Sequence, residues 1–156
     1  MFTEFLGAVW RHLPGIVRRR VTRVGQRRFT VTAGVMIFDD QGRILLLDHA
    51  FRPDSGWGIP GGFLGRGEQP EEALRRELRE EVGLELKSVN LAFVRTFTHR
   101  QVELIFHCQP NGDAHPRGLE VKTAAWFSID ALPEELSADQ RGLLMRVLIN
   151  GAKSQS

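Results

Sequence analysis

The stretch Trp57–Leu86, WGIPGGFLGRGEQPEEALRRELREEVGLEL, places a glycine-rich loop directly before a segment crowded with glutamate. Pro70 suits the first turn of a helix, because its φ is fixed near the helical value and its missing N–H is not needed there. Gly83 suits the residue after the last turn, since glycine takes a left-handed conformation without strain. The stretch therefore predicts a helix over residues 70–82. Ahead of it, WGIPGG is expected to form one short strand that stops at the glycines.

The predicted helix has an apolar stripe and a carboxylate arc beside it. The stripe, spaced at i, i+4 and i+8, consists of Leu74, Leu78 and Val82. Glu77, Glu80 and Glu81 form the arc, although like charges at about 4 Å cost on the order of 4 kcal/mol per pair near a protein surface. A hard divalent cation such as Mg²⁺ or Mn²⁺ reverses that cost, because it binds carboxylate oxygens. The alternative is a solvated face on which glutamates pair with Arg76 and Arg79.

The fixed residues of this stretch follow the spacing G-x5-E-x7-R-E-U-x-E-E-x-G-U, where U is aliphatic, from Gly62 to Leu84 without exception. This pattern resembles the box of the Nudix hydrolase family. The preceding WGIPGG and the later AAWFSIDALP resemble the same family, so that the resemblance covers residues 29–150. It implies an α/β fold, an α/β/α sandwich with a mixed β-sheet and with the box loop and helix on one side. The order of strands and helices in the sequence independently indicates a mixed sheet between helical layers.

The resemblance implies a hydrolase that cleaves a nucleoside diphosphate linked to another moiety, by water attack on phosphorus with Mg²⁺ as cofactor and Mn²⁺ as a substitute. It implies that Glu80 and Glu81 bind the metal and that Glu77 is a further ligand or the base that orients water. The main-chain carbonyl of Gly61 or Gly62 would join the metal ligands, since glycine lets the backbone approach closely. The partner is then a small nucleoside diphosphate derivative.

The resemblance also implies supporting roles. Arg76 would position a neighbouring glutamate, Glu68 would steady the loop, and Gly83 would be a structural residue of the box. Glu120, which lies shortly before the tryptophan of the last predicted strand, is a candidate ligand or base, and a plain loop carboxylate is the alternative. Gly65 stands where family members often carry an acidic residue.

Residues ahead of the box are candidates for substrate binding. His49, Phe51 and Arg52 could line the substrate cleft, where an aromatic ring stacks on a base and an arginine holds a phosphate. Trp57 could stack on substrate or belong to the core. A binding module that senses a nucleotide without cleaving it is an alternative function. That alternative is weakened because no glutamate of the box is lost.

The remaining segments predict four further strand regions and a terminal helix. Strands are expected at residues 29–40, 44–51 and 121–129, and a hairpin is expected around His99–Arg100. Ser137 and Gln140 predict a capping box at the start of the last helix. The single cysteine, Cys108, excludes an intramolecular disulfide and is interpreted as a core residue in a reducing, cytoplasmic environment.

The chain is expected to divide into a basic, helical segment of residues 1–28, a domain of residues 29–150 and a polar tail of residues 151–156. The first segment carries seven arginines against Glu4 alone, a net charge of +6. It could pack its Phe5, Val9 and Trp10 on the domain or on a second copy in a homodimer, or serve as an organellar transit segment. It could also contact nucleic acid or an anionic membrane and so bring the enzyme to RNA ends or lipid-linked diphosphates.

Overall fold

The computed structural model describes residues 2–24, 28–52 and 56–153, without the side chains of 2, 3, 6, 21–23 and 147–153. The last three residues of the expected polar tail lie outside this range, and residues 151–153 continue the terminal helix. In chain order the elements are α1 Phe2–His12, α2 Gly15–Val24, β1 Thr30–Ile37, β2 Ile44–His49, β3 Trp57–Gly58, β4 Gly61–Phe63, α3 Pro70–Val82, β5 Glu85–Phe97, β6 Gln101–Asn111, β7 Val121–Phe127, the 3₁₀ turn Ile129–Ala131 and α4 Ala138–Lys153.

The strands form two sheets. One has the order β4-β1-β6-β5 and is mixed, because β1 runs parallel to β6 and antiparallel to β4. The other is antiparallel, with the order β3-β2-β7. The expectation of one short strand in WGIPGG is therefore wrong. The segment breaks at Ile59–Pro60, so that β3 pairs with β2 and β4 pairs with β1 in the other sheet.

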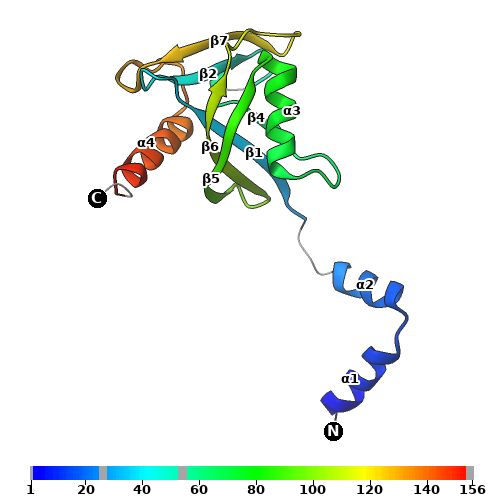
Figure 1. Ribbon diagram of the computed structural model, residues 1–156. Coiled ribbons are helices and arrows are strands. Elements are labelled where there is room, and N and C mark those ends of the chain that lie inside the picture. Colours follow the sequence, from blue (N-terminus) through cyan, green and yellow to red (C-terminus); the bar gives the residue numbers. More distant parts are fainter. Residues whose placement is uncertain (1, 25–27, 53–55, 154–156) are drawn as a thin grey trace.

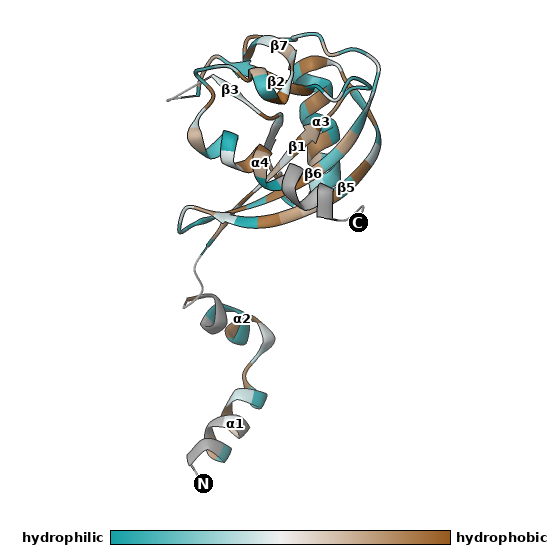
Figure 2. Ribbon diagram, turned by 90° about the vertical axis from the view of Figure 1, so that its left-hand side faces the viewer, coloured by the Kyte–Doolittle hydropathy of each residue, from teal (hydrophilic) through white to brown (hydrophobic). Residues whose placement is uncertain are grey.

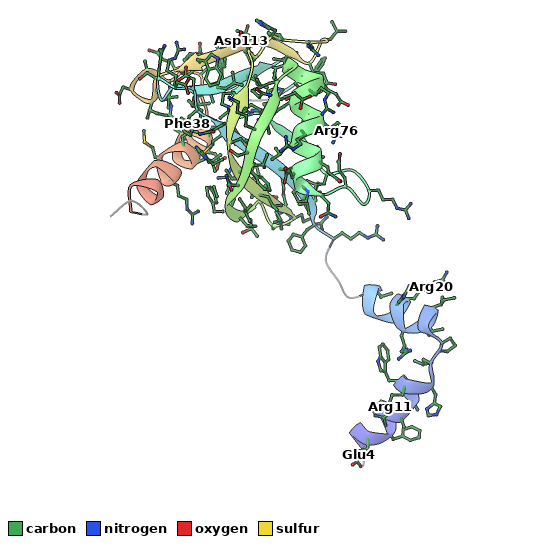
Figure 3. All side chains as sticks on the ribbon, in the orientation of Figure 1. Glu4, Arg11, Arg20, Phe38, Arg76 and Asp113 are labelled. Atoms are coloured by element: carbon green, nitrogen blue, oxygen red, sulfur yellow. The ribbon has the colours of Figure 1, made fainter. Side chains whose placement is uncertain are left out.

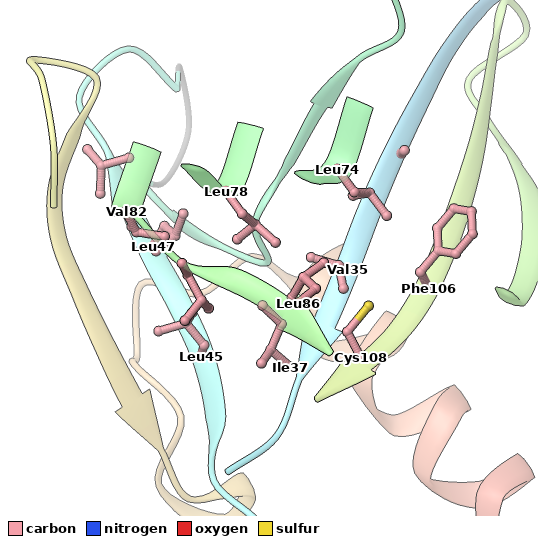
Figure 4. Packing of buried hydrophobic residues seen from close by; sticks show 13 residues of the cluster. Val35, Ile37, Leu45, Leu47, Leu74, Leu78, Val82, Leu86, Phe106 and Cys108 are labelled. Atoms are coloured by element: carbon pink, nitrogen blue, oxygen red, sulfur yellow. The ribbon is translucent and has the colours of Figure 1, made fainter. Parts of the chain in front are cut away.

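Alternating residues of β1 and β2 face two separate cores, which confirms the α/β/α sandwich (Figure 1). Val35 and Leu45 pack with the leucine stripe of α3, and Figure 4 shows this cluster around Leu78. Met36 and Leu46 point to the opposite side, where they join the core that contains residues of α4. Both faces of β2 are buried, as its unbroken run of apolar residues predicts.

The bounds of α3, residues 70–82, are those that the sequence predicts. Gly83 has φ 66° and its N–H donates to the carbonyl of Arg79, so the predicted helix end is also confirmed. A capping box of Gln69 and Glu72 begins the helix and was not predicted. At α4, Ser137 Oγ accepts a hydrogen bond from the Gln140 N–H as predicted, but the Gln140 side chain accepts from the N–H of Ile59 instead of completing a box.

The predicted hairpin is formed by β5 and β6, which pair from Glu85↔Asn111 to Phe97↔Gln101. The turn between them includes Thr98 with φ 61°. In this ribbon, residues Gln101 to Cys108 of β6 pair with β1, on the side of β1 opposite β4.

Cys108 is fully buried on β6, and burial raises the pKa of its thiol to about 12. Because the thiolate is the reactive form, we expect the native protein to resist alkylation by iodoacetamide near neutral pH. The unfolded chain in guanidinium should react to completion. Mass spectrometry of both samples measures the difference, and rapid labelling of the native chain would contradict a core position.

Helices α1 and α2 lie apart from the α/β/α sandwich (Figures 1 and 2). The expectation that Phe5, Val9 and Trp10 pack on the domain is therefore not met, and the Phe5 side chain is 66% exposed. Within the described residues, none of the helices combines the length and the apolar character needed to cross a membrane.

Candidate active site

A cavity of about 660 Å³ opens between the box loop, the start of α4 and the ends of β5 and β6. The carboxylates that line it come from four places in the chain, namely Glu77 and Glu81 on α3, Glu103 on β6, Glu120 before β7 and Asp139 at the start of α4. The backbone of Gly61 and Gly62 forms part of its wall, as do Trp57, Ile59 and Pro60. A second cavity, of about 550 Å³, lies near Asp39 and Trp126 and is lined by none of these carboxylates.

Glu77 lies directly against the glycine of the box loop. A Cβ atom added at Gly62 would overlap the Glu77 carboxylate, so that only glycine permits this approach. Arg76 Nη1 donates to Glu77 Oε1 at 2.9 Å and fixes the carboxylate from the other side. The helix and the loop thus place the Glu77 carboxylate next to the main chain of Gly62, which has no side chain.

Glu81 is the one acidic side chain that is buried among the described residues, with 7% of its surface exposed. Its Oε2 has no hydrogen-bond partner, which is unusual for a buried polar atom. Burial raises the pKa of Glu81 to about 7, and the charges of Glu77, Glu120 and Glu80 act in the same direction, while Arg52 opposes them. Glu81 is therefore a buried carboxylate whose negative charge is not neutralised by the groups around it.

His49, at the end of β2, faces the same carboxylate. Its Nδ1 lies 3.5 Å from Glu81 Oε1, while its Nε2 is buried without a hydrogen-bond partner. Burial, followed by the charge of Arg52, lowers the pKa of His49 to about 4. The imidazole is therefore neutral at neutral pH and has one nitrogen available in the cavity wall.

Arg52 brings positive charge into the cavity. Its guanidinium lies against Gly58, where an added Cβ would overlap it, and Nη2 donates to the carbonyl of Ile59 at 3.3 Å. Burial lowers the pKa of Arg52, while the nearby Glu81 and Glu103 raise it. A guanidinium remains protonated at neutral pH and presents several donors. The cavity therefore contains a cation between two carboxylates.

Arg76 ties the box loop to α3, and its position on the outer side of the helix is visible in Figure 3. Its Nε and Nη2 donate to the two Glu68 oxygens at 2.8 and 3.1 Å, and Nη1 donates to Glu77. Glu68 also accepts from the N–H of Gly65 at 2.6 Å. These hydrogen bonds, with those from Arg76 first, lower the pKa of Glu68 to about 2. Arg76 and Glu68 therefore join the loop at Gly65 to Glu77 on the helix.

One predicted metal ligand, Glu80, and one predicted substrate-binding residue, Phe51, do not line the cavity. Glu80 is 63% exposed and meets Arg76 Nη1 at 3.4 Å, because it projects from α3 about 100° away from Glu81. Only two of the three expected carboxylates therefore converge. Phe51 is 78% exposed in the turn after β2 and is not among the residues of the cavity wall, whereas His49, Arg52 and Trp57 are.

Other residues of the cavity wall were not predicted. They come from β5, β6 and α4, and include Phe97, Gln101, Glu103, Asp139 and Gln140. One signal was available in the sequence, because Glu103 is a charged residue inside the apolar run VELIF. The contribution of α4 had no local signal, since it depends on the contact between Gln140 and Ile59, which are 81 residues apart.

Arg95 joins the sheet to the first turn of α4 at the edge of the cavity. Its Nε donates to Glu103 at 2.5 Å, and Nη1 and Nη2 donate to Asp139 at 2.9 and 2.7 Å. Only 16% of the Arg95 side chain is exposed. Arg95 therefore fixes two residues of the cavity wall that belong to different elements.

We expect Arg95→Gln to raise KM about five- to tenfold with a smaller effect on kcat, because α4 loses an anchor while Glu77 and Glu81 keep theirs. The free energy of unfolding should fall by about 1–3 kcal/mol, since Glu103 is left without its partner. Steady-state kinetics and urea unfolding measure these changes. The matched control is Arg79→Gln, whose exposed pair with Glu85 should contribute less than about 1 kcal/mol. Equal effects of both variants would contradict a specific role of Arg95.

The residues around Glu81 fit a hard divalent cation. Among the described residues, no group of three or more His, Cys, Asp or Glu side chains is arranged to hold a metal ion. The available donors are two carboxylates, one of which has a buried oxygen without a partner, beside a glycine backbone that carries no side chain. Mg²⁺ is commonly bound by one or two carboxylates and completes its ligands with water and substrate phosphates. This donor set therefore suits Mg²⁺ better than a metal that needs a complete cage of side chains.

Comparison with known proteins identifies the domain. The family model described as the NUDIX domain matches residues 28–147, which include the box and every cavity residue named above. This chain belongs to the Nudix hydrolase family. The resemblance that the box pattern indicates is thereby confirmed, and the Nudix box corresponds to the loop and helix that carry Glu77 and Glu81.

Two relatives and one solved structure are similar over most of the domain. A MutT-like protein of Streptomyces ambofaciens is 35% identical over 107 residues, which are 67% of each chain. The NAD-capped RNA hydrolase NudC of Chromobacterium violaceum is 35% identical over 107 residues, which are 66% of this chain and 40% of that protein. The crystal structure of MutT NUDIX hydrolase from Burkholderia pseudomallei matches with a TM-score of 0.68 at 29% identity, covering 76% of this chain and 98% of that chain. The chain is a Nudix-type pyrophosphohydrolase.

Proposed function

We propose that this Nudix domain hydrolyses the diphosphate bond of a nucleoside diphosphate linked to another moiety, with Mg²⁺ held at Glu77 and Glu81. The observation that carries the proposal is the buried Glu81 oxygen without a partner, next to a second carboxylate. An uncompensated carboxylate is costly in a folded protein unless a cation binds it. Mn²⁺ would substitute, since it prefers the same oxygen ligands.

The bound metal would neutralise the diphosphate and lower the pKa of the attacking water. The residues of the chain have separate tasks in this proposal. Arg76 holds Glu77 against the loop, Glu80 contributes negative charge at the edge of the site, and the backbone at Gly62 completes the position next to Glu77. Glu120 lines the cavity from an exposed loop and is the proposed base that orients water, with Glu77 as the other candidate.

Substrate is proposed to extend from the carboxylates towards α4. Arg52 would hold a phosphate oxygen, because its guanidinium lies in the cavity wall close to Glu81. His49 would donate or accept one further hydrogen bond through its free Nε2. Trp57 lines the cavity while its ring packs edge-on against Phe127 at 5.0 Å, so it offers a rigid aromatic surface.

A second candidate substrate is a capped RNA end, which contains the same diphosphate linkage. The observation that favours it is the 35% identity to a protein named NAD-capped RNA hydrolase. The chain spans less than half of that relative. The similarity therefore supports cleavage of a diphosphate bond more strongly than it supports RNA as the group attached to that bond.

The test is release of phosphate, with a coupled phosphatase, from nucleoside triphosphates, ADP-ribose, sugar nucleotides, dinucleotide polyphosphates and NAD, together with an NAD-capped RNA oligomer. We expect turnover of one substrate class that is lost with EDTA and restored by Mg²⁺. Glu77→Gln should lower kcat by at least about 10²-fold. Turnover that is insensitive to EDTA, or no turnover of any substrate by the folded protein, would contradict the proposal.

A further inference from the structure

Helices α1 and α2 expose large apolar side chains that the domain does not cover (Figures 1 and 2). The exposed fractions are 66% for Phe5, 74% for Ile16 and 88% for Val24. Val9 and Trp10 of α1 are also exposed. Apolar surface of this extent on two adjoining helices indicates an interaction site, because single exposed apolar residues are normally scattered.

The apolar residues of α1 share one side of the helix. Phe5 and Val9 are four residues apart and therefore lie above one another, and Trp10 lies next to them. Arg11 is rotated by about 160° from Val9 and projects from the other side. Figure 3 shows Arg11 and Glu4 on this helix and Arg20 on α2. The helix is thus amphipathic, with an aromatic and aliphatic face opposite a charged one.

The same segment concentrates positive charge. Residues 1–28 contain seven arginines and one acidic residue, while the whole chain has a formal net charge of only +2. Arg18, Arg19 and Arg20 are consecutive on α2, directly after Ile16 and Val17. A surface that fits this segment must therefore be both negatively charged and able to accept apolar side chains.

A negative charge and the ability to accept apolar side chains together select one kind of partner for α1 and α2. Pairing with a second copy would bring two segments of charge +6 together, and like charges at close range oppose association. Nucleic acid would satisfy the arginines but would leave the aliphatic side chains of Val9 and Ile16 without apolar partners. Amphipathic helices with arginine on one side and tryptophan or phenylalanine on the other bind in the interface of anionic bilayers.

We propose that α1 and α2 dock this enzyme on the surface of an anionic lipid membrane. The apolar face enters the boundary between headgroups and acyl chains, and the arginines contact lipid phosphates. This contact requires neither the metal nor the cavity of the Nudix domain. The proposal therefore stands apart from the proposed function and is tested without it.

The experiment is flotation of the full-length protein with two kinds of vesicle, pure phosphatidylcholine and phosphatidylcholine mixed with phosphatidylglycerol. We expect binding to the anionic vesicles alone, weakened by high salt. Tryptophan emission should shift to the blue on binding, and Trp10→Phe should remove this shift while Trp57 and Trp126 remain. Absence of binding to anionic vesicles, or equal binding to both kinds, overturns the proposal.

Two paired variants separate the apolar and the charged contributions. Val9→Gln with Trp10→Gln leaves the charge unchanged and should weaken binding about tenfold or more. Arg11→Gln with Arg20→Gln should weaken it about 25-fold, at about fivefold per arginine. The matched control, Arg66→Gln with Lys87→Gln, removes the same charge from exposed positions of the domain and should bind like the unchanged chain.

Three results would overturn the membrane proposal in favour of another occupant. The first is a control pair that binds as weakly as the arginine pair, which would mean that net charge alone attracts the protein. The second is a dimer in sedimentation without lipid that Val9→Gln with Trp10→Gln dissociates. The third is tighter binding to a single-stranded RNA oligomer than to anionic vesicles, with no effect of Val9→Gln and Trp10→Gln.

Discussion

Glu81→Gln is expected to lower kcat by about 10²–10³-fold or more, without preventing folding. The substitution keeps the shape of the side chain but removes the charge that the proposed Mg²⁺ needs at the buried end of the site. Turnover with saturating Mg²⁺ measures the loss, and calorimetric titration with Mg²⁺ should show weaker binding. The matched control is Glu71→Gln on the same helix, whose carboxylate pairs with Arg75 and is 51% exposed. We expect this control to retain full activity.

The same variant is expected to be more stable than the unchanged protein when no metal is present. The pKa of Glu81 is about 7 in the folded state and 4.5 as an unperturbed carboxyl. As pH rises from 4.5 towards 7, the unfolded chain releases this proton more readily than the folded chain, so the folded state loses stability. Above pH 7 the free energy of unfolding is lowered by up to about 3 kcal/mol.

Thermal unfolding in EDTA measures this difference. Glu81→Gln should melt at a higher temperature than the unchanged protein near about pH 8, and the two should converge near about pH 4, where the carboxyl is protonated in both states. Added Mg²⁺ should stabilise the unchanged protein and not the variant. Equal melting temperatures at both pH values would show that Glu81 does not carry an uncompensated charge.

Gly61→Ala is expected to lower the free energy of unfolding by about 3–5 kcal/mol and to abolish activity. Gly61 has φ 149°, and an added Cβ would overlap the carbonyl oxygen of Ala33 and lie 2.7 Å from the Cα of Gly34. Both obstacles are backbone of β1, which cannot rotate away as a side chain can. The strand β4 must therefore separate from β1 and carry Gly62 away from Glu77.

Gly67→Ala is the matched control for this prediction. Gly67 lies in the loop that follows β4, with φ 79°, but an added Cβ would meet no atom within 4 Å. It therefore measures the backbone strain alone, about 1 kcal/mol, without the steric overlap. Urea unfolding and phosphate release separate the two variants. A Gly61→Ala protein as stable as Gly67→Ala would show that β4 has room to move.

The fold and the box helix were predictable because their signals are local. Pro70 and Gly83 mark the ends of α3 by their backbone preferences, and Leu74, Leu78 and Val82 follow the helical repeat. The apolar runs of β1 and β2 likewise indicate buried strands, which the two cores confirm. The family resemblance rests on the fixed spacing of the box residues within residues 62–84, which is a property of the sequence alone.

Which residues line the site was less predictable, because this depends on the orientation of side chains after distant segments of the chain have packed. Helical spacing puts Glu77, Glu80 and Glu81 on one arc, but only the packed structure shows that Glu77 lies against the box loop while Glu80 stays exposed beside Arg76. From the sequence, Phe51 and Arg52 are equally good candidates for lining the substrate cleft. The turn after β2 exposes Phe51, whereas Arg52 folds back over Gly58 into the cavity.

The sequence by itself determined the family, the box helix and the buried strands, since each follows from the conformational preference or repeat of neighbouring residues. Only the tertiary structure decided that WGIPGG divides between two sheets, and that Glu103 and Asp139 meet at Arg95 beside the cavity. The physical reason is the range of the contacts. Arg95 and Asp139 are 44 residues apart and Ile59 and Gln140 are 81 residues apart, so no local preference of the chain specifies that they meet.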